Sequence, residues 1–117
     1  MKKILLSLLI ATGFLSLNAR ETPSFPGGDE ALGKYLSENT RYPEIARENG
    51  VEGIVVVGFM VMPDGSLRSV QVVTFIDPDL EREAVRVVTT MPAWIPAEKN
   101  GTPIEAPSKV SVPFILE

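Results

Sequence analysis

The sequence contains neither cysteine nor histidine among its 117 residues. Without cysteine the chain has no disulfide, no thiol nucleophile, no thiolate metal site and no acylated lipoprotein anchor. Without histidine it lacks the commonest general base, and the two absences together remove the commonest zinc ligands. The formal net charge is −4, so the basic surface typical of nucleic-acid-binding proteins is missing as well. We therefore expect no metal, no cofactor and no nucleic acid.

The chain begins with the pattern of a secretory signal peptide. Lys2 and Lys3 precede an apolar run from Ile4 to Leu17, and Ala19 is a small residue at the cleavage position. The run has 14 residues, whereas a membrane-spanning helix needs about 20. We predict a cleaved signal peptide over residues 1–19, export to the periplasm and no direct membrane span in the mature chain. An uncleaved membrane anchor is the alternative.

The rest of the chain is long enough for one domain with a modest core. Residues 20–28 are rich in proline and glycine, which predicts an extended lead-in held by a buried Phe25. Apolar residues at helical spacing then predict a short helix capped by Asp29. A second short helix is expected from Pro43 to Asn49, with Ile45 and Ala46 facing inward.

A hairpin is predicted from Gly53 to Val73. Proline, aspartate and glycine at residues 63–65 supply the turn, with Gly65 at positive φ. The alternation of apolar residues slips by one position in the second strand, which indicates a bulge near Arg68 or Ser69.

The first strand of this hairpin is apolar on both faces. One face is expected in the core. We expect the helix that carries Tyr35 and Leu36 to cover the other face, because monomeric proteins seldom leave large apolar patches open. A second protein chain is the alternative cover. The residues of this second face are Ile54, Val56, Met60 and Met62.

The clearest helix starts at Asp77 and Pro78, which fit a cap and a first helical position, and it ends before Pro92. The tail from Lys109 to Leu116 alternates as a last strand. These elements predict an α+β fold with two layers, in which a three-stranded antiparallel sheet packs against helices over residues 29–117.

The order and spacing of several motifs resemble the C-terminal domain of TonB, the periplasmic energy transducer that couples inner-membrane energy to outer-membrane receptors. The motifs are "YPEIARENGVEG" (42–53), "VVVGFMVMPDGSLRSVQVV" (55–73), "DPDLEREAVRVV" (77–88), "MPAWIPA" (91–97) and "VPFIL" (112–116). The lead "PSFPGGDEALGKYLSEN" is similar to the segment that precedes this domain in one branch of the family.

The resemblance implies a non-catalytic module of transmembrane transport. Such a module binds an extended segment of an outer-membrane TonB-dependent transporter by strand addition, also called β-augmentation. The final strand and the start of the second short helix are the implied contact regions. The candidate partner-binding residues are Tyr42, Pro43, Arg47, Lys109, Ser111, Pro113 and Ile115.

Pro113 independently indicates which edge of the last strand is open. Main-chain groups of alternate residues point to opposite edges of a strand. Because proline has no N–H donor, it is tolerated where its nitrogen faces away from a neighbouring strand. Ser111, Pro113 and Ile115 are therefore expected on the open edge. Protection of that edge from unwanted pairing is the simpler explanation of the proline.

The chain departs from a full-length TonB, which has an uncleaved membrane helix and a long proline-rich spacer. We expect a stand-alone exported form that binds transporters, or a competitor or adaptor of a full-length TonB. Whether the domain forms a homodimer is left open.

A cell-wall protein that binds or hydrolyses peptidoglycan is the hypothesis from another class. A carboxylate pair among Asp77, Asp79, Glu81 and Glu83 would serve glycoside cleavage, although capping of a helix start is the favoured explanation. Tyr42 and Trp94 could stack on a sugar, but aromatic residues of this kind more often belong to a core. Arg82 and Arg86 could clamp an anion, but a solvated helix face is the favoured explanation.

Overall fold

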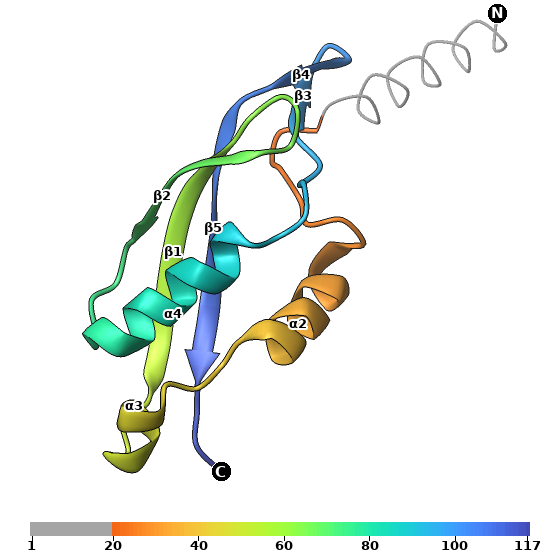
Figure 1. Ribbon diagram of the computed structural model, residues 1–117. Helices are drawn as coiled ribbons and strands as arrows, with labels where there is room; N and C mark the ends of the chain where they lie inside the picture. The colour runs from red at the N-terminus through yellow and green to blue at the C-terminus, as the bar shows by residue number, and fades with distance from the viewer. Residues whose placement is uncertain (1–19) are drawn as a thin grey trace, which may run out of the picture.

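The computed structural model describes residues 20–117, and the predicted signal peptide lies outside this range. The elements in chain order are α2 (Gly28–Asn39), α3 (Glu44–Glu48), β1 (Gly53–Val61), β2 (Leu67–Val72), α4 (Pro78–Thr89), β3 (Ala97–Lys99), β4 (Thr102–Ile104) and β5 (Ala106–Phe114) (Figure 1). A three-stranded antiparallel sheet has the order β2-β1-β5, and β3 pairs with β4 in a two-stranded sheet. The predicted α+β fold is confirmed. No helix within residues 20–117 is long and apolar enough to cross a membrane.

The core lies between one face of the three-stranded sheet and the apolar stripe of α4. Asp77 begins this helix as predicted, because its Oδ2 accepts hydrogen bonds from the backbone N–H groups of Asp79 and Leu80 at 3.0 and 3.1 Å. Alternate residues of β1 and β5 meet the stripe. The largest fully buried side chains are Phe114, Leu80, Val55, Val57, Val61, Val87, Val88 and Val112.

The lead-in is pinned to the core by Phe25, as predicted. Phe25 is buried, and its ring centroid lies 5.9 Å from that of Trp94 and 5.6 Å from that of Tyr35. The cap predicted at Asp29 is wrong. The helix begins two residues earlier than that cap would place it, after Gly27 with φ of 92°, and no side chain caps it. Two successive residues at positive φ make this entry, which glycine adopts readily.

The short helix α3 follows Pro43, which is its N-cap rather than its first helical residue. Gly50 stops the helix at φ of 66°, in the role predicted for it. Ala46 is buried as expected, but Ile45 is 63% exposed, so its predicted inward orientation is wrong. Consecutive residues of an α-helix point about 100° apart, so Ile45 and Ala46 do not share one face of α3.

The predicted cover for the second face of β1 is wrong. Tyr35 and Leu36 pack with the core, on the same side of the sheet as α4. The Tyr35 hydroxyl donates to the Val87 carbonyl at 2.9 Å, which places α2 in the helical layer. On the opposite face Ile54 remains 50% exposed. The apolar residues of α2 therefore complete the core instead of covering the back of the sheet.

The hairpin has the predicted bulge. Ser69 adopts a φ of 56°, and the pairing shifts between Gly58 and Met60 of β1. A second hairpin, β3–β4, is not among the predicted elements. Its strands have 3 residues each, too few to give a recognisable alternation.

Candidate functional site

The outer edge of β5 is unpaired in the three-stranded sheet. On β1, the Val56 N–H donates to Thr74 Oγ1 at 2.8 Å and the Val56 carbonyl accepts from Val73 N at 2.7 Å, so both main-chain groups of Val56 point toward the β2 side. Val55 and Val57 therefore point toward β5, because the direction alternates along a strand.

The pairing of β1 with β5 determines which main-chain groups of β5 face β1 and which face outward. Val112 lies opposite Val55, whereas Ser111 and Pro113 lie opposite Val56 and Ile54. Val112 thus bonds with β1, and the main-chain groups of Ser111 and Pro113 point outward. The edge agrees with the one that Pro113 indicates in the sequence. Ile115 follows the end of the strand, which stops at Phe114.

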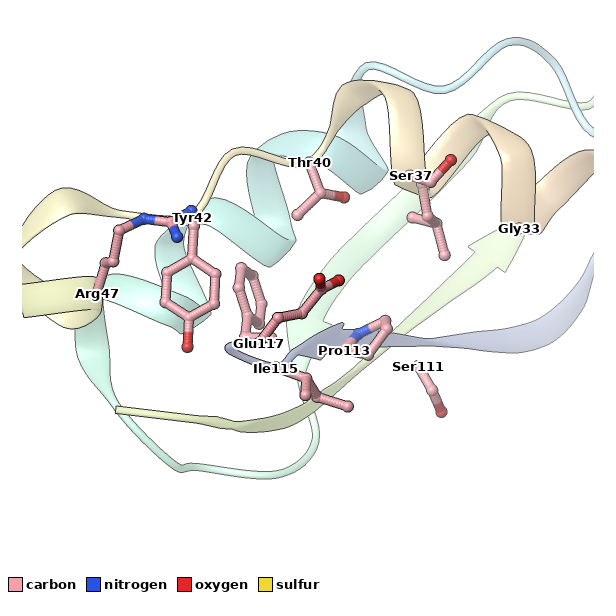
Figure 2. A pocket seen from close by; sticks show the side chains of 11 residues that line it. Gly33, Ser37, Thr40, Tyr42, Arg47, Ser111, Pro113, Ile115 and Glu117 are labelled. Carbon is pink, nitrogen blue, oxygen red and sulfur yellow. The ribbon is translucent and has the colours of Figure 1, made fainter. Parts of the chain in front are cut away.

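A groove of about 690 Å³ lies between this edge and α2 (Figure 2). We call it the β5 groove. Its lining residues are Gly33, Leu36, Ser37, Thr40, Tyr42, Arg47, Ser111, Pro113, Phe114, Ile115 and Glu117. The structure thus brings together most of the candidate partner-binding residues, from α3, the segment before it, and β5. Pro43 and Lys109 are not among the lining residues. Pro43 borders a separate depression with Arg41 and Arg86.

Tyr42 forms a fixed end of the β5 groove. Its hydroxyl donates to the Val51 carbonyl, and its ring meets the ring of Phe114 edge-to-face at 5.7 Å. Partial burial raises the pKa of Tyr42, Glu52 raises it further, and Arg47 opposes both. The phenol therefore stays neutral. The Arg47 guanidinium lies 4.7 Å from the centroid of the Tyr42 ring, in a cation–π contact that holds it beside the groove.

The side of the groove formed by α2 was not predicted as part of the site. Gly33, Leu36, Ser37 and Thr40 line it from this helix and its C-cap. The helix is fastened to α4, through the Tyr35 hydroxyl and through the Asn39 carbonyl, which accepts from Arg86 at 2.8 Å. A glycine in the middle of a helix was the signal available in the sequence, since glycine is unfavourable there.

The acidic cluster of α4 is engaged in structural contacts. Asp77 caps the helix, Asp79 pairs with Arg82, and Glu81 accepts from the backbone of Ile76. Glu83 accepts two hydrogen bonds from Arg86 and one from the backbone N–H of Arg41. Burial acts to raise the pKa of Glu83, but these donors outweigh it and the pKa is lowered. Arg82 and Arg86 are thereby committed to carboxylates of their own helix.

Trp94 belongs to the core. It is 6% exposed, and its ring packs edge-to-face against Phe59 at 5.0 Å. Trp94 therefore has no exposed ring face on which a sugar could stack. Among residues 20–117, no group of three or more acidic side chains is placed to hold a metal ion.

Comparison with known proteins agrees with this geometry. Residues 38–116 match the family model described as Gram-negative bacterial TonB protein C-terminal. The chain belongs to the TonB C-terminal family. No curated protein matches the chain. Among solved structures, the TonB-CTD of Helicobacter pylori (residues 179–285), determined by NMR, has 24% sequence identity and a TM-score of 0.56. This match covers 73% of the present chain and 77% of the other.

A second NMR structure of the Helicobacter pylori TonB-CTD, residues 194–285, has 23% identity and a TM-score of 0.57, and covers 73% of this chain and 89% of that one. At this identity the likeness establishes the TonB C-terminal fold. The family match begins at residue 38, so α3, α4 and the sheet lie within it. Helix α2 lies almost entirely before it.

Proposed function

We propose that this protein binds an extended segment of an outer-membrane TonB-dependent transporter by adding it as a strand to β5. The observation that supports this proposal most strongly is the unpaired edge of β5 beside the β5 groove. Unpaired N–H and C=O groups of an edge strand are a template for another extended chain. Membership of the TonB C-terminal family supports the transporter as the partner.

The docking edge has a limited set of main-chain donors. Lys109 and Ser111 supply N–H groups between two prolines, Pro107 and Pro113, which supply only carbonyls. A docked strand would therefore form its complete main-chain pairing in the middle of the edge and lose one bond at each proline. This arrangement limits indiscriminate pairing while still leaving a docking site.

A binding role, and not catalysis, is the function best supported. The carboxylates of α4 have structural partners, and Trp94 is buried in the core. Serine hydroxyls have no histidine to activate them anywhere in the sequence. These findings favour the binding module over the peptidoglycan-hydrolysing alternative. Whether the chain assists, competes with or adapts a full-length TonB is decided by its partners in the cell envelope.

The proposed location is the periplasm, reached through the signal peptide predicted over residues 1–19. Mass spectrometry of the protein recovered from cell envelopes should find Arg20 or a close neighbour at the N-terminus. An intact segment from Met1 to Leu17 would contradict the cleavage and favour a membrane anchor.

The strand-addition proposal is tested by NMR titration of the isotopically labelled, exported protein. Synthetic extended peptides from the periplasm-facing segments of outer-membrane transporters serve as probes. Binding should shift the amide signals of Lys109, Ser111 and Ile115. The exposed β4 residue Ile104 is the internal control and should stay in place. Shifts confined to other surfaces, or no shift with any peptide, would refute docking at β5.

A further inference from the structure

We propose that α2 forms the second wall of the β5 groove and selects the docked segment by the size of one apolar side chain. Gly33 and Ser37 of α2 line the groove opposite the outward edge of β5 (Figure 2). A segment paired with β5 would have main-chain partners on one side and this helix on the other. The inference rests on the proposed function and adds to it which segments are accepted.

Gly33 is the residue that carries the argument. Within a helix, glycine is less favourable than alanine, so its presence calls for a local reason. A Cβ atom at Gly33 would meet no atom within 4 Å, so no neighbouring segment requires the side chain to be absent. Gly65 is the opposite case, because a Cβ there would lie 2.3 Å from the Trp94 carbonyl oxygen. The missing side chain at Gly33 instead leaves open space in the groove.

The floor of this space is apolar. Leu36 and Phe114 both line the groove, and they are 9% and 1% exposed. Side chains of a docked strand alternate between the two faces of the sheet. Those on the core side would pass over Leu36 and Phe114 and beside Gly33. A leucine, isoleucine or phenylalanine at that position would fill the space and would itself be removed from water. An alanine would leave the space unfilled.

Helix α2 is placed to act as a wall without closing the groove. It is bonded to α4 through Tyr35 and Asn39. Among residues 20–117, no side-chain hydrogen bond joins α2 to β5. Gly33, Leu36 and Ser37 also precede the family match, which starts at residue 38. The selection is therefore a property of α2, whereas the edge of β5 lies within the family match.

The test uses two peptides that differ only at the central core-facing residue, leucine in one and alanine in the other. Both are titrated into the exported protein, into the variant Gly33→Leu and into the matched control Lys34→Leu. Lys34 is exposed on the same helix and does not line the groove. We expect the wild type to bind the leucine peptide at least tenfold more tightly than the alanine peptide. Gly33→Leu should abolish that preference, and Lys34→Leu should keep it.

Replacement of a helical glycine by leucine favours the helix, so Gly33→Leu should fold, and its amide spectrum checks this. Ser37→Leu, on the same side of α2, is the second variant and should also weaken binding of the leucine peptide.

The possible outcomes separate the role of α2 from the proposed function. An equal preference for the leucine peptide in the wild type and in both variants would overturn the role of α2 alone, provided the Ser111 and Ile115 signals still shift. Loss of those shifts with every peptide in the wild type would overturn the proposed function and this inference together. Concentration-dependent shifts of the same signals without peptide would assign the groove to a second copy of the chain and also overturn the inference.

Discussion

Pro113 is the single residue whose chemistry connects the sequence to the open edge of β5. Its nitrogen cannot donate, and the register places it on the outward side of β5, opposite Ile54. The sequence alone could therefore predict which edge is open. It could not predict what lies across from that edge, because α2 is separated from β5 by most of the chain.

Pro113→Ala should strengthen binding of an extended transporter segment. The new N–H would add one hydrogen bond on the open edge, with a net value of about 0.5 to 1.5 kcal/mol. Pro107→Ala supplies the other missing N–H of the same outward edge, so it strengthens binding only if the docked strand extends beyond the groove to this residue. Dissociation constants from calorimetry measure both. An unchanged affinity for Pro113→Ala would mean that the docked strand does not pair at this position.

Position 65 requires glycine for two reasons: its backbone conformation and the lack of room for a side chain. It has a φ of 88°, and a Cβ would lie 2.3 Å from the Trp94 carbonyl oxygen. Gly65→Ala should therefore lower the free energy of unfolding by about 2 kcal/mol or more, from the left-handed backbone and the clash together. Gly101→Ala isolates the backbone effect, since Gly101 has a φ of 79° and open space around it. It should cost about 1 kcal/mol. Equal losses in urea denaturation would show that the close contact with Trp94 is unimportant.

At the scale of elements, α4 and the β1–β2 hairpin follow from local chemistry. Asp77 and Pro78 define the start of α4, and Gly65 defines the turn between the strands. The start of α2 was predicted two residues late because two glycines at positive φ, not a side-chain cap, form the entry. The β3–β4 hairpin was missed because three-residue strands carry too little periodicity.

The difference between the two helix starts is testable. Asp77→Ala removes a side chain that accepts from two backbone N–H groups, so it should destabilise the protein by about 1 kcal/mol. Asp29→Ala removes an acidic residue from the first turn of α2, where no side chain caps the helix. Its cost should stay within about 0.5 kcal/mol. Thermal unfolding followed by circular dichroism compares the two, and equal costs would contradict the assignment of Asp77 as the cap.

At the scale of the whole molecule, the lead-in and α2 complete the core on the side of the sheet that carries α4, which for α2 is opposite to the side predicted. Phe25 packs on Trp94, and Trp94 packs on Phe59 of β1. In Figure 1, α2 lies beside β5 in the same layer as α4. The outer face of the sheet, with Ile54 half exposed, is left without cover from α2.

Deletion of residues 20–39 should therefore expose the part of the core that the lead-in and α2 cover. The shortened protein should lose stability and self-associate, because Trp94 and Phe59 become accessible. Sedimentation velocity measures the association. Ile54→Lys is the control that separates the two faces, since it places a charge on the back of the sheet and should not restore a monomer in the shortened chain. A monomeric shortened protein, or rescue by Ile54→Lys, would contradict this arrangement of faces.

The sequence by itself determined the principal helices and strands, the hairpin turn, the bulge and the open edge of the last strand. Each of these depends on local properties: apolar periodicity, a capping aspartate, a glycine at positive φ, and a proline without an N–H donor. The tertiary structure alone decided which face α2 covers and that α2 stands across a groove from β5. Tyr35 and Leu36 are apolar enough to pack on either side of the sheet. The choice depends on contacts with Val87, Phe25 and the core, which are distant in the sequence and which no local pattern encodes.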